Sequence, residues 1–236
     1  MGFVPERVFA LGNPSWEAKA KAKENRDRLR AIGRKRFGVA EGDIMVLYAV
    51  TNDLDDATLY GPGHVEYFDG SERGPLLEFL LAVQDAKRNG GRVSGVIRQK
   101  PGLNDAAVFI SKEIELLCPS VQFDVERTFD GEAASNCTLC AADVVVGFDT
   151  LAVSDAAMLG IPAMYYVPNL KTSGKGDPQF AFNESRITVP FHEPNMLRNL
   201  ILDIGRDPKV LSRLRSSIVP NAAENIADKL VELFGK

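Results

Sequence analysis

The sequence predicts an α/β protein built on a doubly wound parallel sheet. Several short runs are almost entirely apolar, such as residues 44–50 (IMVLYAV) and 143–147 (DVVVG), and strands that are buried on both faces have this composition. Amphipathic stretches of helical length, such as residues 75–88, alternate with these runs. Alternating strands and helices are typical of right-handed crossovers that cover both faces of a sheet. We therefore expect a Rossmann-like fold with a helical N-terminal extension and C-terminal helices.

Length and composition describe an ordinary globular protein. The chain has 236 residues, of which 45% are hydrophobic and 25% charged, with a net charge of −4. These values exclude a disordered tail and a fibrous protein, and we expect a single domain over residues 1–236. A dedicated nucleic-acid-binding protein is usually basic, so we expect no nucleic-acid partner.

The cysteines and the N-terminus indicate a reducing, cytoplasmic setting. Three cysteines, an odd number, do not form a disulfide framework. Residues 1–14 lack the apolar core of a signal peptide. No run approaches the roughly 18 apolar residues of a membrane span, so none is expected.

The elements follow from local patterns. Residues 8–11 form a short strand, and residues 15–36 form one long, mostly solvated helix with Ser15 as its N-cap. The polar, glycine-rich stretch 52–74 is a long loop of the kind that is often functional. The remaining expected helices are 75–88, 104–116, 132–141, 150–159, 193–205, 207–217 and 221–234, and the remaining strands are 92–98, 121–123, 143–147, 162–167 and 186–190.

Ligands of open parallel sheets bind outside the carboxyl ends of the strands. Among the strand–helix junctions, residues 147–150 (GFDT) give the most specific signal, because an apolar strand runs directly into a helix. A helix N-terminus offers free N–H groups and a partial positive charge to a phosphate. Thr150 could add a hydroxyl, and the Asp155 carboxylate could accept hydrogen bonds from a ribose. The alternative is that Asp149 or Thr150 only caps the helix.

At this point the chain resembles the nucleotide-binding C-terminal half of GT-B glycosyltransferases, and in particular CDP-glycerol glycerophosphotransferases and UDP-N-acetylglucosamine 2-epimerases. The stretch 143–162 matches their segment of an aspartate, three apolar residues, small hydroxyl or glycine residues, an acid and Gly-x-Pro. Three further segments agree in order: 12–14 (GNP), 48–51 (YAVT) and 98–101 (RQKP).

The resemblance implies roles for individual residues. It places Thr150 at the first phosphate-contacting position and Asp155 at the ribose-contacting acid, and it adds Thr51 at the end of the first strand. Arg98 and Lys100 would neutralise a pyrophosphate. Asp149, beside Thr150, completes the substrate-binding set. The implied ligand is a nucleoside diphosphate sugar or a CDP-alcohol, with no cofactor and no bound divalent cation.

The chain also departs from the family pattern. Leu151 replaces the second Ser or Gly and thereby removes one phosphate donor, and Lys100 replaces a histidine. The N-terminal half of a GT-B enzyme, which supplies the acceptor site, has no counterpart in the sequence. We therefore expect an N-terminal acceptor domain or a partner subunit.

Other groups of chemically active residues have simpler interpretations. Cys137 and Cys140 form a lone CxxC without the further ligands of a zinc site, so we expect buried helix cysteines and no metal. The acidic loop 53–69 lacks the calcium-loop spacing. His64, in a glycine-rich turn, is the best candidate for a general base because imidazole titrates near neutral pH; a surface turn histidine is the alternative.

The sequence thus predicts the donor nucleotide-binding domain of a GT-B type glycosyltransferase or polyol-phosphate transferase. Two alternatives stay open. One is part of a UDP-sugar 2-epimerase-like enzyme. The other is a non-catalytic regulatory or scaffold domain that retains the fold.

Overall fold

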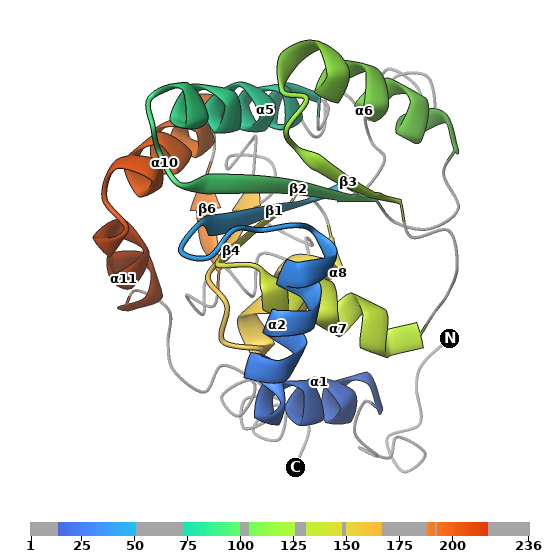
Figure 1. The fold of residues 1–236 in the computed structure, drawn as a ribbon. Helices are drawn as coiled ribbons and strands as arrows, with labels where there is room; N and C mark the ends of the chain where they lie inside the picture. The colour runs from blue at the N-terminus through green and yellow to red at the C-terminus, as the bar shows by residue number, and fades with distance from the viewer. Residues whose placement is uncertain are drawn as a thin grey trace, which may run out of the picture.

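A computed structural model describes residues 14–50, 73–99, 104–125, 131–147, 150–166, 188–191 and 193–216. Its centre is one sheet of six parallel strands in the order β3-β2-β1-β4-β5-β6 (Figure 1). This order and the flanking helices are those of a Rossmann-like doubly wound fold, so the expected fold class is confirmed. The strands are β1 (Ile44–Val50), β2 (Val93–Gln99), β3 (Gln122–Val125), β4 (Val144–Gly147), β5 (Ala163–Tyr166) and β6 (Val189–Phe191).

Helices cover both faces of the sheet. One face carries α5, α6 and α10, and the other carries α2, α7 and α8 (Figure 1). The described helices are α1 (Pro14–Glu24), α2 (Arg26–Arg36), α5 (Arg73–Arg88), α6 (Asn104–Leu117), α7 (Gly131–Ala141), α8 (Leu151–Met158), α10 (Pro194–Arg206) and α11 (Lys209–Ser216). None of these helices is long and apolar enough to cross a membrane.

Side chains of β1 divide between two hydrophobic cores. Val46 and Tyr48 pack with the helices of one face, whereas Met45 and Leu47 pack with those of the other. All seven residues of β1 are buried, because alternate side chains of a strand point to opposite faces and both faces are covered. Burial on both faces explains why residues 44–50 form a continuous apolar run in the sequence.

The helical N-terminal extension differs from the expected single helix 15–36. The structure has two helices, α1 and α2, with Asn25 between them. The Asn25 side-chain amide donates to the Lys21 carbonyl oxygen at 2.9 Å. Asparagine favours such local bonds over helical backbone geometry, and its φ of −100° and ψ of 16° lie outside the helical region.

Helix α2 packs closely on α7. A Cβ atom on Gly33 would lie 2.7 Å from the Cβ of Ala141, and still closer to the Cys137 carbonyl oxygen. Only glycine allows the two backbones to approach this far. This contact holds α2 against the helix that precedes β4.

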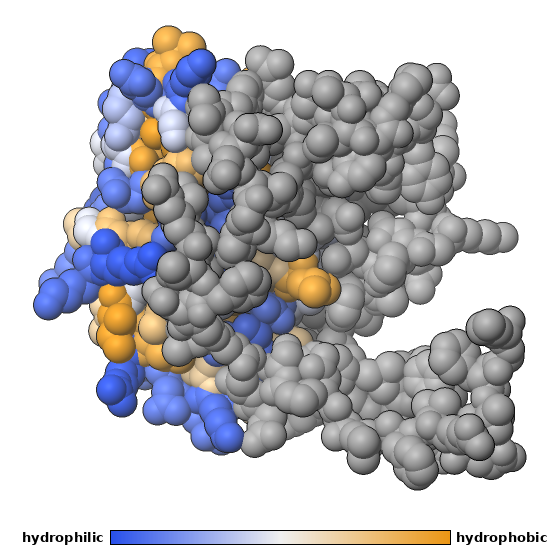
Figure 2. Space-filling view, turned by 90° about the vertical axis from the view of Figure 1, so that its right-hand side faces the viewer, coloured by the Kyte–Doolittle hydropathy of each residue, from blue (hydrophilic) through white to orange (hydrophobic). Residues whose placement is uncertain are grey.

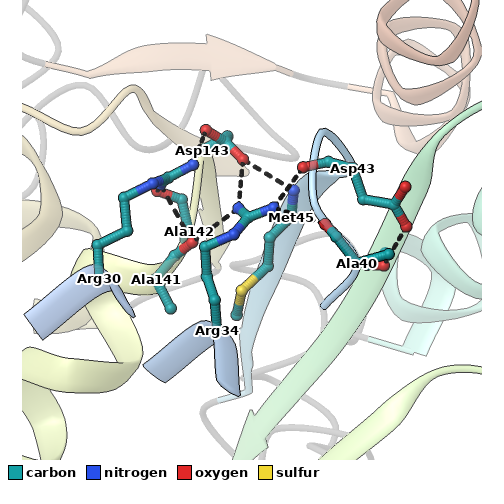
Figure 3. A network of polar contacts seen from close by, with 9 residues as sticks. Arg30, Arg34, Ala40, Asp43, Met45, Ala141, Ala142 and Asp143 are labelled. Atoms are coloured by element: carbon teal, nitrogen blue, oxygen red, sulfur yellow. Dashed lines mark hydrogen bonds and ion pairs between the residues drawn. The ribbon is translucent and has the colours of Figure 1, made fainter. Parts of the chain in front are cut away.

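Asp143 fastens α2 to the sheet (Figure 3). Arg30 Nη2 lies 2.8 Å from Asp143 Oδ1, and Arg34 Nη1 lies 3.1 Å from Oδ2. The Met45 N–H donates to the same Oδ2 at 2.9 Å, and the Asp143 side chain is 8% exposed. The two guanidinium groups also donate to backbone oxygens of residues 40, 43, 141 and 142.

Replacing Asp143 with Ala should therefore destabilise the chain strongly. The change leaves two partly buried guanidinium groups and the Met45 N–H without their acceptor. Removing one member of a buried charge pair costs about 3–5 kcal/mol. Urea denaturation measures the loss in the free energy of unfolding.

Asp203→Ala is the matched control, since Asp203 pairs with Arg206 at 3.8 Å on an exposed surface. That change should cost less than about 1 kcal/mol. Equal losses for the two variants would contradict a structural role for Asp143.

Candidate functional site

The candidate site lies at the carboxyl end of β4, where the topology of the sheet reverses. β1 and β4 are neighbours, and the next described helices after them, α5 and α8, lie on opposite faces. Ligands of this fold bind where the connections diverge in this way. Helix α8 begins at Leu151, four residues after Gly147, the last residue of β4.

Gly147 allows α8 to lie close to the end of β4. A Cβ atom on Gly147 would lie 2.9 Å from Val153 Cγ2, and still closer to the Thr150 methyl group. Any larger residue would push α8 away from the strand. This close approach fixes the position of the first turn of α8 relative to the carboxyl end of β4.

Thr150 is the N-cap of α8. Its hydroxyl oxygen accepts from the Ala152 N–H at 3.3 Å, and its carbonyl oxygen accepts from the Val153 N–H at 3.3 Å. The capping role that the sequence left open is therefore present. It does not exclude ligand binding, because a threonine hydroxyl that accepts one hydrogen bond can still donate another. No described residue accepts from the N–H groups of Thr150 and Leu151.

Leu151, the departure from the family pattern, lies in the first turn of α8 and is 73% exposed. Its side chain offers no hydrogen bond to a phosphate. Anion binding at this end of α8 would therefore depend on backbone N–H groups, the Thr150 hydroxyl and the helix dipole.

Arg98 lies in the same row of the sheet as Gly147. Ala49 of β1 is in register with Arg98 on one side and with Gly147 on the other. Neighbouring strands lie about 4.8 Å apart, so the two backbones are separated by about 10 Å. The Arg98 guanidinium donates to Ser135 Oγ of α7 at 3.0 Å. This contact draws Arg98 toward α7, on the face that also carries α8.

A second charged group lies beside Arg98. Asp124 of β3 is in register with Arg98 and is buried. Its carboxylate pairs with Arg36 at 2.7 Å and accepts from the Thr138 hydroxyl at 3.4 Å. Asp124 was not singled out by the sequence analysis, because nothing in the local pattern near residue 124 shows that α2 supplies its partner.

Asp155, the expected ribose-contacting acid, lies in the second turn of α8. Its Oδ2 forms an ion pair with Lys19 Nζ of α1 at 3.1 Å, and its side chain is 27% exposed. The same Lys19 amine donates to Asn136 Oδ1 of α7 at 2.7 Å. The sequence did not single out Lys19 or Asn136, since no local signal distinguishes Lys19 from its neighbours Lys21 and Lys23.

Four of the expected site residues, Thr51, His64, Lys100 and Asp149, lie outside the described residues, as does the acidic loop 53–69. Of the described candidates, Thr150 caps α8, Asp155 lies on α8, and Arg98 contacts α7, which packs on α8. Within the described ranges, no group of three or more His, Cys, Asp or Glu side chains is placed to hold a metal ion.

The chain has the fold of the C-terminal half of GT-B enzymes. Solved structures with this fold include the C-terminal domain of the glycosyltransferase LpcC from Francisella tularensis (TM-score 0.52, 11% identity, 85% of this chain and 92% of that one). UDP-GlcNAc 2-epimerase from Neisseria meningitidis, bound to UDP-GlcNAc, aligns with a TM-score of 0.54 at 11% identity over 91% of this chain and 52% of its own. The wall teichoic acid polymerase TagF, soaked with CDPG, aligns with a TM-score of 0.51 at 13% identity over 99% and 52%.

The expected resemblance to the GT-B half is thus confirmed at the level of the fold. The chain spans about half the length of the epimerase and of TagF. No protein-family model and no curated protein matches the sequence.

The two cysteines of the CxxC segment lie on α7, on the face that contacts α2. Cys140 is buried and Cys137 is half-buried. Burial raises the pKa of both thiols above the usual 9.0, and the positive charges of Arg36 near Cys137 and of Arg26 near Cys140 oppose that rise. Both side chains are therefore neutral thiols at neutral pH.

We expect both thiols to react slowly with iodoacetamide in the native protein at pH 8, because the thiolate is the reactive form. In urea, both should react at the rate of a free cysteine. Stability should also fall as the pH rises above about 9.0, because the unfolded thiols then lose protons that the folded ones retain. Mass spectrometry of alkylated protein and urea melts at several pH values measure the two effects.

The Cys118→Ala variant simplifies that experiment by removing the third thiol. Fast native alkylation of Cys137 and Cys140 at pH 8 would contradict the raised pKa values. Stoichiometric zinc that is lost in the Cys137→Ala, Cys140→Ala double variant would contradict their structural role.

Proposed function

We propose that the chain is the donor nucleotide-binding domain of a GT-B type transferase. The group transferred would be a glycosyl or polyol-phosphate group, carried by a nucleoside diphosphate sugar or a CDP-alcohol. The observation that carries this proposal is the close approach of Gly147 to Thr150 and Val153, which holds the N-terminus of α8 at the carboxyl end of β4, the neighbour of β1 in the sheet. The GT-B fold of the chain supports the same site.

The phosphates of the donor would bind at the first turn of α8. Thr150 would donate its hydroxyl proton, and the helix dipole would add about half a positive charge. Arg98 would supply a full positive charge; its backbone lies about 10 Å from that of Gly147 along the row, a distance that its side chain and a pyrophosphate together can span. Lys100, one residue beyond β2, would add a second cation, and Asp149 and Thr51 would line the same edge.

The ribose would be held by Asp155. Carboxylates accept strong hydrogen bonds from hydroxyl groups, and Lys19 engages only one of the two carboxylate oxygens. The neighbouring solved structures give this proposal its ligand class, since one is bound to UDP-GlcNAc and another was soaked with CDPG.

Transfer requires an acceptor site and a proton acceptor. We propose that a second domain or a partner subunit provides the acceptor site, facing the carboxyl edge of the sheet. His64 would act as the general base. The second candidate function is that of a UDP-sugar 2-epimerase-like enzyme, which the alignment with the Neisseria meningitidis epimerase favours.

Replacing Thr150 with Ala should weaken the binding of UDP or CDP. The change removes a hydroxyl donor to a charged phosphate, a hydrogen bond worth about 1.5–3 kcal/mol, or roughly tenfold to a hundredfold in Kd. It should also cost about 1 kcal/mol of stability, because the cap is lost. Isothermal titration calorimetry and thermal melts separate the two effects.

Asp207→Ala is the matched control, because Asp207 Oδ1 accepts from the Lys209 N–H and so caps α11. That variant should lose similar stability and keep its nucleotide affinity. Unchanged affinity in Thr150→Ala, in a protein that binds UDP or CDP, would place the phosphate elsewhere. Failure of wild-type protein to bind either nucleotide would contradict the proposed function.

Nucleotide binding should be independent of divalent cations. Arg98 and Lys100 would neutralise the phosphates without a metal. UDP and CDP are titrated once in the presence of EDTA and once in the presence of millimolar magnesium. The two Kd values for each nucleotide should agree within about threefold. A loss of more than about tenfold in EDTA would instead assign a metal to the acidic residues of loop 53–69.

A further inference from the structure

Lys19 is a buried cation that joins three helices. Its side chain is 5% exposed, and it lies on α1, which packs against both α7 and α8 (Figure 1). Its amine contacts Asn136 Oδ1 at 2.7 Å and Asp155 Oδ2 at 3.1 Å. A buried ammonium group is costly unless it is paired and hydrogen-bonded, and here both requirements are met by groups on neighbouring helices.

Burial distinguishes Lys19 from the other two lysines of α1. In the stretch AKAKAK at 18–23, Lys19 is buried, whereas Lys21 and Lys23 are exposed. Buried lysines are rare. The pattern singles out Lys19 as a side chain with a specific partner, and that partner is the acid expected to contact ribose.

The Asp155 carboxylate is paired through one of its two oxygens. Lys19 contacts Oδ2, whereas no described residue contacts Oδ1, and 27% of the side chain is exposed. A carboxylate with both oxygens paired would have little capacity for a ligand. A carboxylate with neither oxygen paired could rotate freely. A single buried contact fixes the direction of the other oxygen.

We propose that Lys19 is a positioning residue for ribose recognition. It holds the Asp155 carboxylate in one orientation, so that Oδ1 accepts a hydrogen bond from a ribose hydroxyl group. Asn136 in turn fixes the Lys19 amine. This inference rests on the proposed function, because it takes Asp155 as the ribose ligand. Ligand groups need such support, since recognition depends on geometry held to within about 0.5 Å.

The proposal links the N-terminal extension to specificity. α1 lies outside the sheet and its crossovers, yet it supplies the amine that orients a residue of α8. The docking of α1 would then determine how well the protein distinguishes a ribonucleotide from a deoxyribonucleotide. Phosphate binding at Thr150, about one and a half turns away, would not depend on α1.

The test compares the wild-type chain with Lys19→Met, Lys19→Gln, Lys23→Met and Asp155→Ala. Calorimetry gives Kd values for UDP and CDP, for their 2′-deoxy analogues and for inorganic pyrophosphate. A hydrogen bond to a charged oxygen is worth roughly a tenfold to hundredfold preference for the ribonucleotide. Lys19→Met and Lys19→Gln should reduce this preference to within about threefold, while the Kd of pyrophosphate stays within about threefold.

Lys23→Met is the matched control, because it removes the same charge from the exposed side of the same helix. It should keep the full preference for ribose. Pyrophosphate binding serves as the check on folding, and Lys19→Gln retains a hydrogen-bond donor for Asn136 or Asp155 if Lys19→Met proves too unstable to titrate.

The outcomes separate this inference from the proposed function. If Asp155→Ala loses the ribose preference and both Lys19 variants keep it, Lys19 has a structural role only, and the proposed function stands. If Asp155→Ala keeps the preference, Asp155 is not the ribose ligand, and both proposals fail at this residue. If Lys23→Met loses the preference as Lys19→Met does, the effect comes from general charge, and the positioning role is contradicted.

Discussion

The arrangement of this half of the molecule depends on the buried charge of Asp143. The carboxylate sits at the amino end of β4, where two arginines of α2 and one backbone N–H of β1 converge on it. Each guanidinium also donates hydrogen bonds to backbone carbonyl oxygens, so that the buried charges are both paired and hydrogen-bonded. These contacts hold α2 across the amino ends of β1 and β4. Helix α1, which precedes α2, consequently packs against α7 and α8.

This fastening and the candidate site lie at opposite ends of the strands. The amino end carries the ion pairs that hold the layers together, and the carboxyl end carries Gly147 and the exposed Leu151 in the first turn of α8. The division suits a ligand-binding fold, because the structural charges are paired among themselves. The same layer also brings Lys19 to Asp155, so one packing arrangement serves both stability and the proposed recognition of ribose.

On the face that Figure 2 presents, the described residues mix hydrophilic and hydrophobic side chains.

Similarity to GT-B enzymes is carried by the fold, and sequence identity of 11–13% alone would not show it. A Rossmann-like sheet constrains burial and hydrogen bonding, which many sequences satisfy. Recognition at the site depends on a few side chains, and these are where the chain departs from the pattern, as at Leu151. Fold and function are therefore separate conclusions here.

The sequence by itself determined the six strands of the described sheet, their parallel arrangement and the start of a helix near Thr150, whereas the expected strand 8–11 and helix 221–234 lie outside the described residues. These follow from local properties: apolar runs, helical periodicity and the short segment 147–150 between a strand and a helix. Only the tertiary structure decided that the N-terminal helix is interrupted at Asn25 and that Lys19 is buried while Lys23 is exposed. The same holds for the ion pairs of Asp143 with two arginines of α2. Each of these depends on partners that are distant along the chain or on the packing of a particular helix face. Local pattern cannot rank near-identical lysines, because the difference between them is created only when α1 meets α7 and α8.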